Sequence, residues 1–265
     1  MPVEFKRVPA IDKCFAILDL FAKSKGPLGI SEISRQLGLN KSTVFNTVHT
    51  LTDLDVLENG PDGKFGFGVH LYTLGNTAGN RSELIKTVHP YLEKINGETK
   101  LSAFLGIRSD HRAIILDKVD TAYDIKISSE VGMRLPLLAG AGGKALLSLF
   151  SEKEIDKTLS SHKLKKFTPN SNVNKTAYKR EVLRVRREGI ALDMEEYIEG
   201  IIAFATPLKT HRKDLHAAIW AVGLKRQVSK DVVPKFSRYL KEIGDEINER
   251  FSMSAGPFVV DKALK

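Results

Sequence analysis

The stretch from residue 30 to residue 54, ISEISRQLGLNKSTVFNTVHTLTDL, constrains the fold more than any other part of the chain. Glycine precedes it, and Glu32 is spaced so that its carboxylate can accept hydrogen bonds from the free amides of a first helical turn. Apolar residues then recur on one helical face: Ile30, Ile33 and Leu37. Gly38 ends this helix, and Asn40 is placed to cap a second one. The stretch therefore predicts two helices joined by a tight glycine turn.

The second predicted helix has two unlike faces. Its inward stripe consists of Val44, Val48, Leu51 and Leu54. Its outward face carries Lys41, Ser42, Phe45, Asn46, His49 and Thr50. A helix with such a polar face fits the major groove of DNA and reads base edges from its first turns. We expect contacts to bases or phosphates from Ser42, Thr43, Asn46 and His49, and a phosphate contact from Lys41.

A predicted hairpin follows the second helix. Residues 56–58 and 64–67 read as short strands, and NGPDG between them has strong hairpin chemistry. This order of elements predicts a winged helix-turn-helix. A small α/β core without a DNA-binding role is the alternative.

The run LGISEISRQLGLNKSTVFNTVHTLTDLDVLE resembles the winged helix-turn-helix of the isocitrate-lyase-regulator (IclR) family of bacterial transcription factors. The resemblance implies double-stranded promoter or operator DNA as a partner. In that family the second helix usually carries an arginine where this chain has Asn46. The difference concerns which operator is read and leaves the docking of the helix unchanged.

Composition and length favour a folded chain of two compact units, since 42% of its 265 residues are hydrophobic and 28% are charged. No run approaches the ~18 apolar residues of a transmembrane helix, and residues 1–13 lack the apolar core of a secretory signal. We therefore expect no membrane partner. The single cysteine, Cys14, lies among apolar positions, which predicts a small buried side chain in a reducing compartment such as the cytoplasm.

The net charge of +9 lies away from the predicted helix-turn-helix. Residues 1–70 hold eight Lys/Arg and eight Asp/Glu, whereas residues 157–187 hold ten Lys/Arg against Glu181 alone. A solvated helix face with a flexible loop is favoured there over a contact surface for DNA or an acidic partner. The total charge thus supports DNA binding only weakly, and the motif carries the prediction.

The stretch VGMRLPLLAGAGGKALLSLF is the second informative one. Gly140, Gly142 and Gly143 begin a predicted helix, so exposed amides and the positive end of the helix dipole favour a small anion or carboxylate. A phosphate-binding P-loop is excluded, because it needs glycine in place of Leu138 and Ser or Thr in place of Ala145. From these residues alone, close packing and an anion site are equally good interpretations.

Two stretches, RLPLLAGAGGKALLS and EGIALDMEEYIEGIIAFATPL, resemble the signatures of the IclR-family effector domain, a GAF-like pocket that binds small metabolites. The resemblance covers nearly the whole chain. It implies that the glycine-rich helix start offers amides to a carboxylate, and that an aspartate and strand residues complete the pocket. The matching positions are Gly140, Ala141, Gly142, Asp193, Ala203, Trp220 and Val222.

Three of these positions differ from the family pattern. Ala203 stands where the family often has cysteine, and Trp220 and Val222 stand where it often has serine. Loss of polar groups and gain of an aromatic wall disfavour a tiny hydrophilic acid such as glyoxylate or pyruvate. We predict an organic acid with an apolar or aromatic body as the effector. The alternative is that Trp220 fills the cavity, leaving a DNA-binding protein that senses no ligand.

No catalytic residue, metal site or cofactor is predicted. Asp193, Glu195 and Glu196 have no nucleophile or metal set beside them, and the seven histidines are scattered. Arg134 and Lys144 are interpreted as ion-pair residues rather than ligand contacts. An enzyme and a purely architectural DNA-binding protein are the rival classes.

Strands grouped with helices before and after them predict an α+β fold with an antiparallel sheet. Strands are predicted at 101–107, 113–119, 124–128, 201–206 and 215–222, and helices at 9–21, 69–80, 83–97, 140–150, 152–159, 175–187 and 229–251. The expected parts are a winged helix-turn-helix domain at 1–70, a linker helix at 71–86, an effector-binding and oligomerisation domain at 87–251, and a flexible tail at 252–265. Because one helix-turn-helix makes too few contacts for tight, selective binding, a homodimer is expected, often paired into a tetramer in this family.

Overall fold

A computed structural model of the protein describes residues 5–80, 82–123, 127, 129–210 and 215–254. The chain divides into two compact units, Met1–Ser82 and Glu83–Lys265, which we call the N-terminal unit and the C-terminal unit. Over the described residues, no helix combines the length and the apolar character that a membrane crossing requires.

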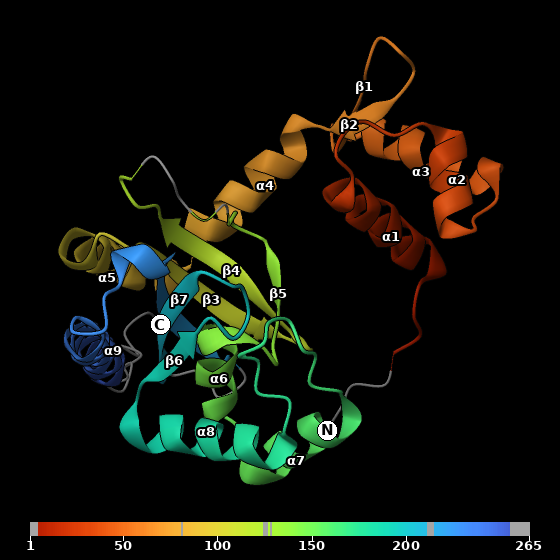
Figure 1. Ribbon diagram of the computed structural model, residues 1–265. Helices are drawn as coiled ribbons and strands as arrows, with labels where there is room; N and C mark the ends of the chain where they lie inside the picture. Colours follow the sequence, from red (N-terminus) through yellow and green to blue (C-terminus); the bar gives the residue numbers. More distant parts are fainter. Residues whose placement is uncertain (1–4, 81, 124–126, 128, 211–214, 255–265) are drawn as a thin grey trace, which may run out of the picture. The chain divides into compact units, whose positions relative to one another are not determined.

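The N-terminal unit packs α1, α2 and α3 together, with a small hairpin beside them (Figure 1). Its elements are α1 (Pro9–Lys23), α2 (Ile30–Leu37), α3 (Lys41–Asp53), β1 (Leu57–Asn59), β2 (Phe65–Phe67) and α4 (Val69–Asn80). The buried apolar core is Ile17, Phe21, Leu28, Ile33, Val44, Val48, Leu51, Leu57 and Phe65. β1 and β2 pair in antiparallel register. The predicted two helices, glycine turn and hairpin are thereby confirmed.

Capping explains where α2 begins and ends. The amide of Gly29 donates to Oε2 of Glu32 at 3.0 Å, and Gly38 ends the helix with a φ of +65°. Asn40 occupies the N-cap position of α3, but its side chain makes no capping hydrogen bond, so that part of the prediction is wrong. The first turn of α3 is closed by the backbone, where the amide of Val44 donates to the carbonyl of Asn40 at 3.1 Å.

The predicted inward stripe of α3 is confirmed for three of its four residues. Val44, Val48 and Leu51 are buried. Leu54, predicted to face inward, is 58% exposed. The helix ends at Asp53, so Leu54 no longer follows the helical spacing that places the other three against the core.

The C-terminal unit is built around one six-stranded sheet. Its elements are α5 (Glu83–Thr99), β3 (Ser102–Ser109), β4 (Arg112–Val119), β5 (Arg134–Pro136), α6 (Gly140–Ser148), α7 (Glu152–Ser161), α8 (Lys175–Glu188), β6 (Ala191–Met194), β7 (Ile201–Leu208), β8 (Ala217–Leu224), the 3₁₀ turn η1 (Lys225–Gln227) and α9 (Val233–Ser254). The strand order is β5-β4-β3-β8-β7-β6, and all neighbours pair antiparallel. The predicted α+β class with an antiparallel sheet is confirmed.

Both faces of this sheet are covered by helices. Helices α5 and α9 lie on one face and α6, α7 and α8 on the other (Figure 1). Successive side chains of a strand point to opposite faces. On β8, therefore, Ile219 and Ala221 join the core beside α5 and α9, whereas Ala218 and Trp220 join the core beside α6 and α8.

Two short strands lie outside the sequence prediction. β5 and β6 have three and four residues and form the two edges of the sheet. Runs of this length are too short to show a periodicity, and their pairing depends on the neighbouring strand. The predicted strand at 124–128 falls on residues of which 124–126 and 128 lie outside those described, as do residues 255–265 of the predicted tail.

Part of the basic stretch at 157–187 makes contacts inside the unit. Lys179 on α8 pairs with Asp156 on α7 at 2.7 Å. Arg186 donates from Nε to the carbonyl of Ser148 at 2.9 Å, and from Nη2 to the carbonyl of Phe150. These contacts hold α8 beside α6 and α7, so some of the excess charge has a structural role.

Replacement of Gly38 by alanine tests the turn between α2 and α3. The added Cβ meets no atom within 4 Å, so the positive φ alone sets the cost, about 1–2 kcal/mol. Gly26→Ala is the matched control, because its Cβ also meets no atom within 4 Å and its φ lies outside the left-handed region. We expect that control to be neutral or to stabilise by up to ~1 kcal/mol. Amide hydrogen exchange within residues 30–54 measures the stability of this region in both variants. Equal stability of the two variants would contradict the prediction.

Candidate functional site

The outer face of α3 presents most of the predicted DNA contacts to solvent. Lys41, Ser42 and Asn46 are exposed, and Thr43 and His49 are half-buried. All five lie within the first nine residues of one helix. A single groove can therefore receive them together, as the N-terminal turns of a recognition helix require.

His49 differs from the other four because it is packed between two aromatic rings. Its ring centroid lies 4.2 Å from that of Phe45 on the same helix and 5.6 Å, edge-on, from that of Phe65 on the hairpin. The sequence indicates the first contact, since the two residues are four apart on a helix. It gives no signal for the second, which joins α3 to β2.

A cavity of about 140 Å³ lies in the C-terminal unit, bounded by α6, the sheet and the turn after β6. Its lining includes all seven positions that the family resemblance implies: Gly140, Ala141, Gly142, Asp193, Ala203, Trp220 and Val222. Helix α6 and strands β6, β7 and β8 supply them. The fold thus brings together residues that are far apart along the chain.

The rest of the cavity wall is mostly apolar and was missed by sequence reasoning. It includes Phe104, Met133, Leu135, Tyr197 and Ile198. Tyr197 and Ile198 follow Asp193 closely in the chain, so their proximity to it was a usable signal. Phe104 comes from β3, and only the strand pairing places it beside Trp220, with ring centroids 6.2 Å apart.

Helix α6 begins directly at the cavity. Ala139 at its N-cap position makes no side-chain capping hydrogen bond, and Gly140 takes a φ of +69°. The amides of the first turn and the positive end of the helix dipole therefore face a space lined by Gly140, Ala141 and Gly142. This end of the helix can hold a carboxylate.

Asp193 is the one charged side chain among the described residues that line the cavity. It is 3% exposed, and its Oδ1 accepts a hydrogen bond from the amide of Glu196 at 2.6 Å. A Cβ placed on Gly140 would lie 3.2 Å from its Oδ2, so the carboxylate sits against the start of α6. Burial raises the pKa of Asp193, while the hydrogen bond from Glu196 and the positive charge of Lys144 act in the opposite direction.

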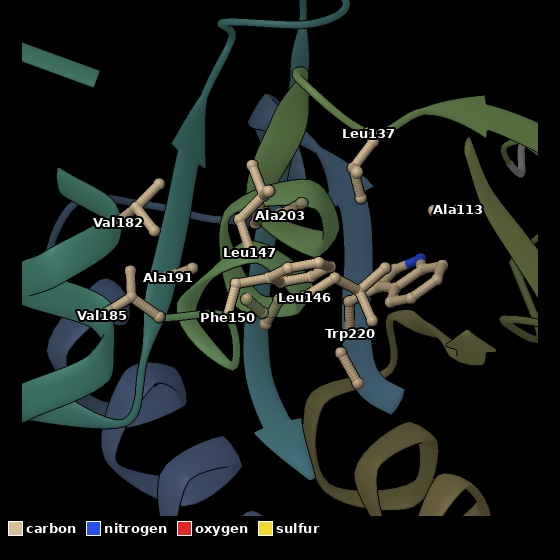
Figure 2. Packing of buried hydrophobic residues seen from close by; sticks show 14 of the residues in the cluster. Ala113, Leu137, Leu146, Leu147, Phe150, Val182, Val185, Ala191, Ala203 and Trp220 are labelled. Carbon is tan, nitrogen blue, oxygen red and sulfur yellow. The ribbon is translucent and has the colours of Figure 1, made fainter. Parts of the chain in front are cut away.

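Trp220 forms a wall of the cavity and leaves space beside it. Its indole is 4% exposed and extends from β8 among the side chains of the α6 core (Figure 2). Two glycines make room for it, since a Cβ on Gly106 would overlap the ring and one on Gly142 would lie 3.1 Å from it. A large aromatic side chain is therefore accommodated by small neighbours, without closing the cavity.

Lys144 forms the predicted ion pairs, but it is buried inside the unit rather than placed at the surface. Its Nζ lies 2.6 Å from Glu196 Oε1 and 2.7 Å from Glu181 Oε2, and donates to the carbonyl of Leu192 at 3.0 Å. Burial raises the pKa of Glu196 despite the nearby ammonium. This network ties α6 to α8, to β6, which carries Asp193, and to the turn after β6. Arg134 is exposed and lines a separate groove.

Glu195, at the start of this turn, also has structural partners. Glu195 pairs with Lys225 at 2.5 Å and accepts the amide of Gly200 at 3.0 Å. The hydroxyl of Thr168 donates to the carbonyl of Glu195 at 2.6 Å. Within the described part of the chain, no group of three or more His, Cys, Asp or Glu side chains is arranged to hold a metal ion.

Two family profiles match the chain. The one described as "Bacterial transcriptional regulator IclR C-terminal" matches residues 77–249, and the one described as "IclR helix-turn-helix domain" matches residues 10–61. The chain belongs to the IclR family. All three stretches that resemble this family in sequence thus fall within matched segments.

Known IclR-family proteins match over nearly their whole length. The transcriptional repressor IclR of Escherichia coli strain K12 is 28% identical over 245 residues, which are 91% of this chain and 89% of that protein. The crystal structure of the Thermotoga maritima IclR has a TM-score of 0.73 at 27% identity and covers 92% of this chain and 99% of that one. An IclR homologue of Microbacterium hydrocarbonoxydans, crystallised with 4-hydroxybenzoate, has a TM-score of 0.80 at 21% identity over 92% and 99% of the two chains. This protein is accordingly an IclR-family transcriptional regulator with a helix-turn-helix and a C-terminal effector domain.

Lys144→Met tests the buried network in this IclR-family effector domain. Removal of the ammonium leaves Glu181 and Glu196 facing each other, and we expect a loss of about 3 kcal/mol in unfolding free energy. The pKa of Glu196 is already raised by burial and rises further in this variant. The loss of unfolding free energy therefore becomes smaller as the pH falls through that pKa and Glu196 is protonated. Urea unfolding at several pH values measures this. Lys86→Met, which removes an exposed partner 3.9 Å from Glu83, is the control and should cost ~0.5 kcal/mol or less. A similar, pH-independent loss in both variants would contradict the prediction.

Proposed function

We propose that this IclR-family regulator binds promoter DNA through α3 and that a small organic acid with an apolar or aromatic body, bound in the cavity of the C-terminal unit, controls that binding. The observation that carries the proposal is the cavity itself. It joins the uncapped amides at the start of α6 to a largely apolar wall that includes Trp220. A carboxylate is the natural partner of the first and an apolar body of the second.

The size of the cavity supports an effector with a single ring or a short aliphatic chain. Its volume of about 140 Å³ is close to the roughly 150 Å³ that accommodates benzene in a protein core. Glyoxylate or pyruvate would leave the faces of Trp220 and Phe104 uncovered. The Microbacterium homologue bound to 4-hydroxybenzoate is an example of an aromatic acid held by an IclR-like fold.

The rival interpretations have less support. A cavity filled by Trp220 would leave no space, whereas a volume remains beside the indole. An enzyme using this unit would need reactive groups free to act, but Glu195 and Glu196 are paired with Lys225 and Lys144. The Escherichia coli relative is named a transcriptional repressor, which supports a function other than catalysis.

A homodimer, paired further into a tetramer, fits the N-terminal unit. Ile11 and Phe15 on α1 are 55% and 63% exposed, and Tyr72 and Leu74 on α4 are 69% and 53% exposed. Exposed apolar side chains on both helices support contact with a second copy of the chain. Two copies would read two half-sites of an operator. As a bacterial regulator, the protein would act on this DNA in the cytoplasm.

Selection of bound sequences from random and neighbouring genomic DNA, followed by footprinting, tests the DNA-reading surface. Asn46→Ala and Ser42→Ala should relax sequence preference by removing base contacts. Lys41→Ala should weaken binding to all sequences alike and reduce the salt dependence by about one phosphate contact. Tight binding that survives alanine at all three positions would overturn the role of α3.

Fluorescence of Trp220, the single tryptophan of the chain, tests the effector site. A titration with 4-hydroxybenzoate, aliphatic acids, glyoxylate and pyruvate should show a response to the larger acids only. Burial raises the pKa of Asp193, and a bound carboxylate nearby raises it further. Binding of the acid is therefore accompanied by uptake of a proton, and the affinity falls as the pH rises through that pKa. Asp193→Asn should remove this pH dependence. Binding of only the smallest polar acids, or none, would refute the effector class.

A further inference from the structure

Phe45 is an apolar side chain on the polar outer face of α3. It is 50% exposed and lies outside the buried core of the N-terminal unit. Its neighbours on this face are Ser42 three residues before it and Asn46 directly after it. Because this ring lies in the middle of the proposed DNA-reading surface, it would be covered when DNA is bound there.

The ring of Phe45 is held in place from one side. Its centroid lies 4.2 Å from that of His49, whose own ring lies 5.6 Å from that of Phe65. Phe65 is 3% exposed and pairs with Leu28 and β1, so the row ends in the core. A ring supported in this way loses little side-chain freedom on binding, and its outer face is available for contact.

The major groove offers few groups that match an apolar surface. Base edges there present hydrogen-bond donors and acceptors, and the C5-methyl of thymine is the apolar exception. Asn46, the next residue, has the amide geometry that recognises adenine. Adjacent positions on α3 are thus suited to the two members of A·T pairs.

We propose that Phe45 is a specificity-determining residue that packs against the C5-methyl group of a thymine in each operator half-site. The inference rests on the proposed insertion of α3 into the major groove and names one chemical group that it reads there. His49 then acts as a positioning residue that supports the ring, which explains why it is itself half-buried.

Deoxyuridine scanning of a selected operator tests this contact. Each thymine is replaced singly by deoxyuridine, which removes the methyl group and leaves base pairing intact. Burial of one methyl group corresponds to about a fourfold change in affinity. For the native protein we expect about that loss at one thymine per half-site and little change at the others.

The decisive comparison combines this DNA with protein variants. Phe45→Ala should bind the thymine and deoxyuridine operators equally, because the partner of the methyl group is gone. Phe45→Leu, which keeps an apolar side chain, should retain part of the preference. Lys41→Ala is the matched control and should weaken binding to both operators by the same factor, with the thymine preference intact.

The outcomes separate this inference from the proposed function. A thymine preference that persists in Phe45→Ala, or a native protein that responds to no deoxyuridine, overturns the role of Phe45 while DNA reading by α3 stands. Failure to select any sequence overturns DNA reading itself, and the inference with it. Circular dichroism of Phe45→Ala should match the native protein, since the side chain lies outside the core.

Discussion

The close packing of the start of α6 shapes the cavity of the C-terminal unit. A Cβ on Gly142 would lie 3.1 Å from the ring of Trp220 on β8, and one on Gly143 would overlap the carbonyl of Leu137 in the connection from β5, so glycine permits both approaches. At this separation the first turn of α6 lies against Asp193 and its later turns fill the core beside α8. The cavity is the space that remains where the helix begins, because the glycines have no side chain and Ala141 has only a methyl group to fill it. The packing of α6 and the proposed ligand site therefore have one origin.

That packing also explains how a tryptophan is tolerated in the centre of the sheet. Trp220 would collide with side chains at Gly106 or Gly142, and both positions lack one. The indole therefore gives the cavity an apolar wall at a position where the family often has a polar side chain. Asp193, which lies against the start of α6, is the one charged side chain among the described residues of a mostly apolar lining. Such an arrangement orients a ligand by its charged end and discriminates by the shape of the other.

How much of this the sequence predicts depends on the range of the interactions. Helix α2 is set by local signals at Glu32 and Gly38, and the long strands by continuous apolar runs, so their presence and order are readable. The edge strands β5 and β6 exist only through their neighbours. The contact of His49 with Phe65 joins a helix to a hairpin, and no local pattern indicates it. The lining of the cavity was predictable where the family resemblance reached, and the apolar wall beyond it was not.

The distribution of charge limits how the protein can bind DNA. Residues 1–70 carry as many acidic as basic residues, so long-range attraction to the phosphate backbone is weak. In the proposed function, affinity then comes from short-range contacts of α3, doubled by the proposed second copy. Binding that rests on few contacts is sensitive to small changes in how two recognition helices are spaced. An effector that favours one spacing by a coupling of about 1–3 kcal/mol changes operator occupancy from several-fold to a hundredfold, which is enough for regulation.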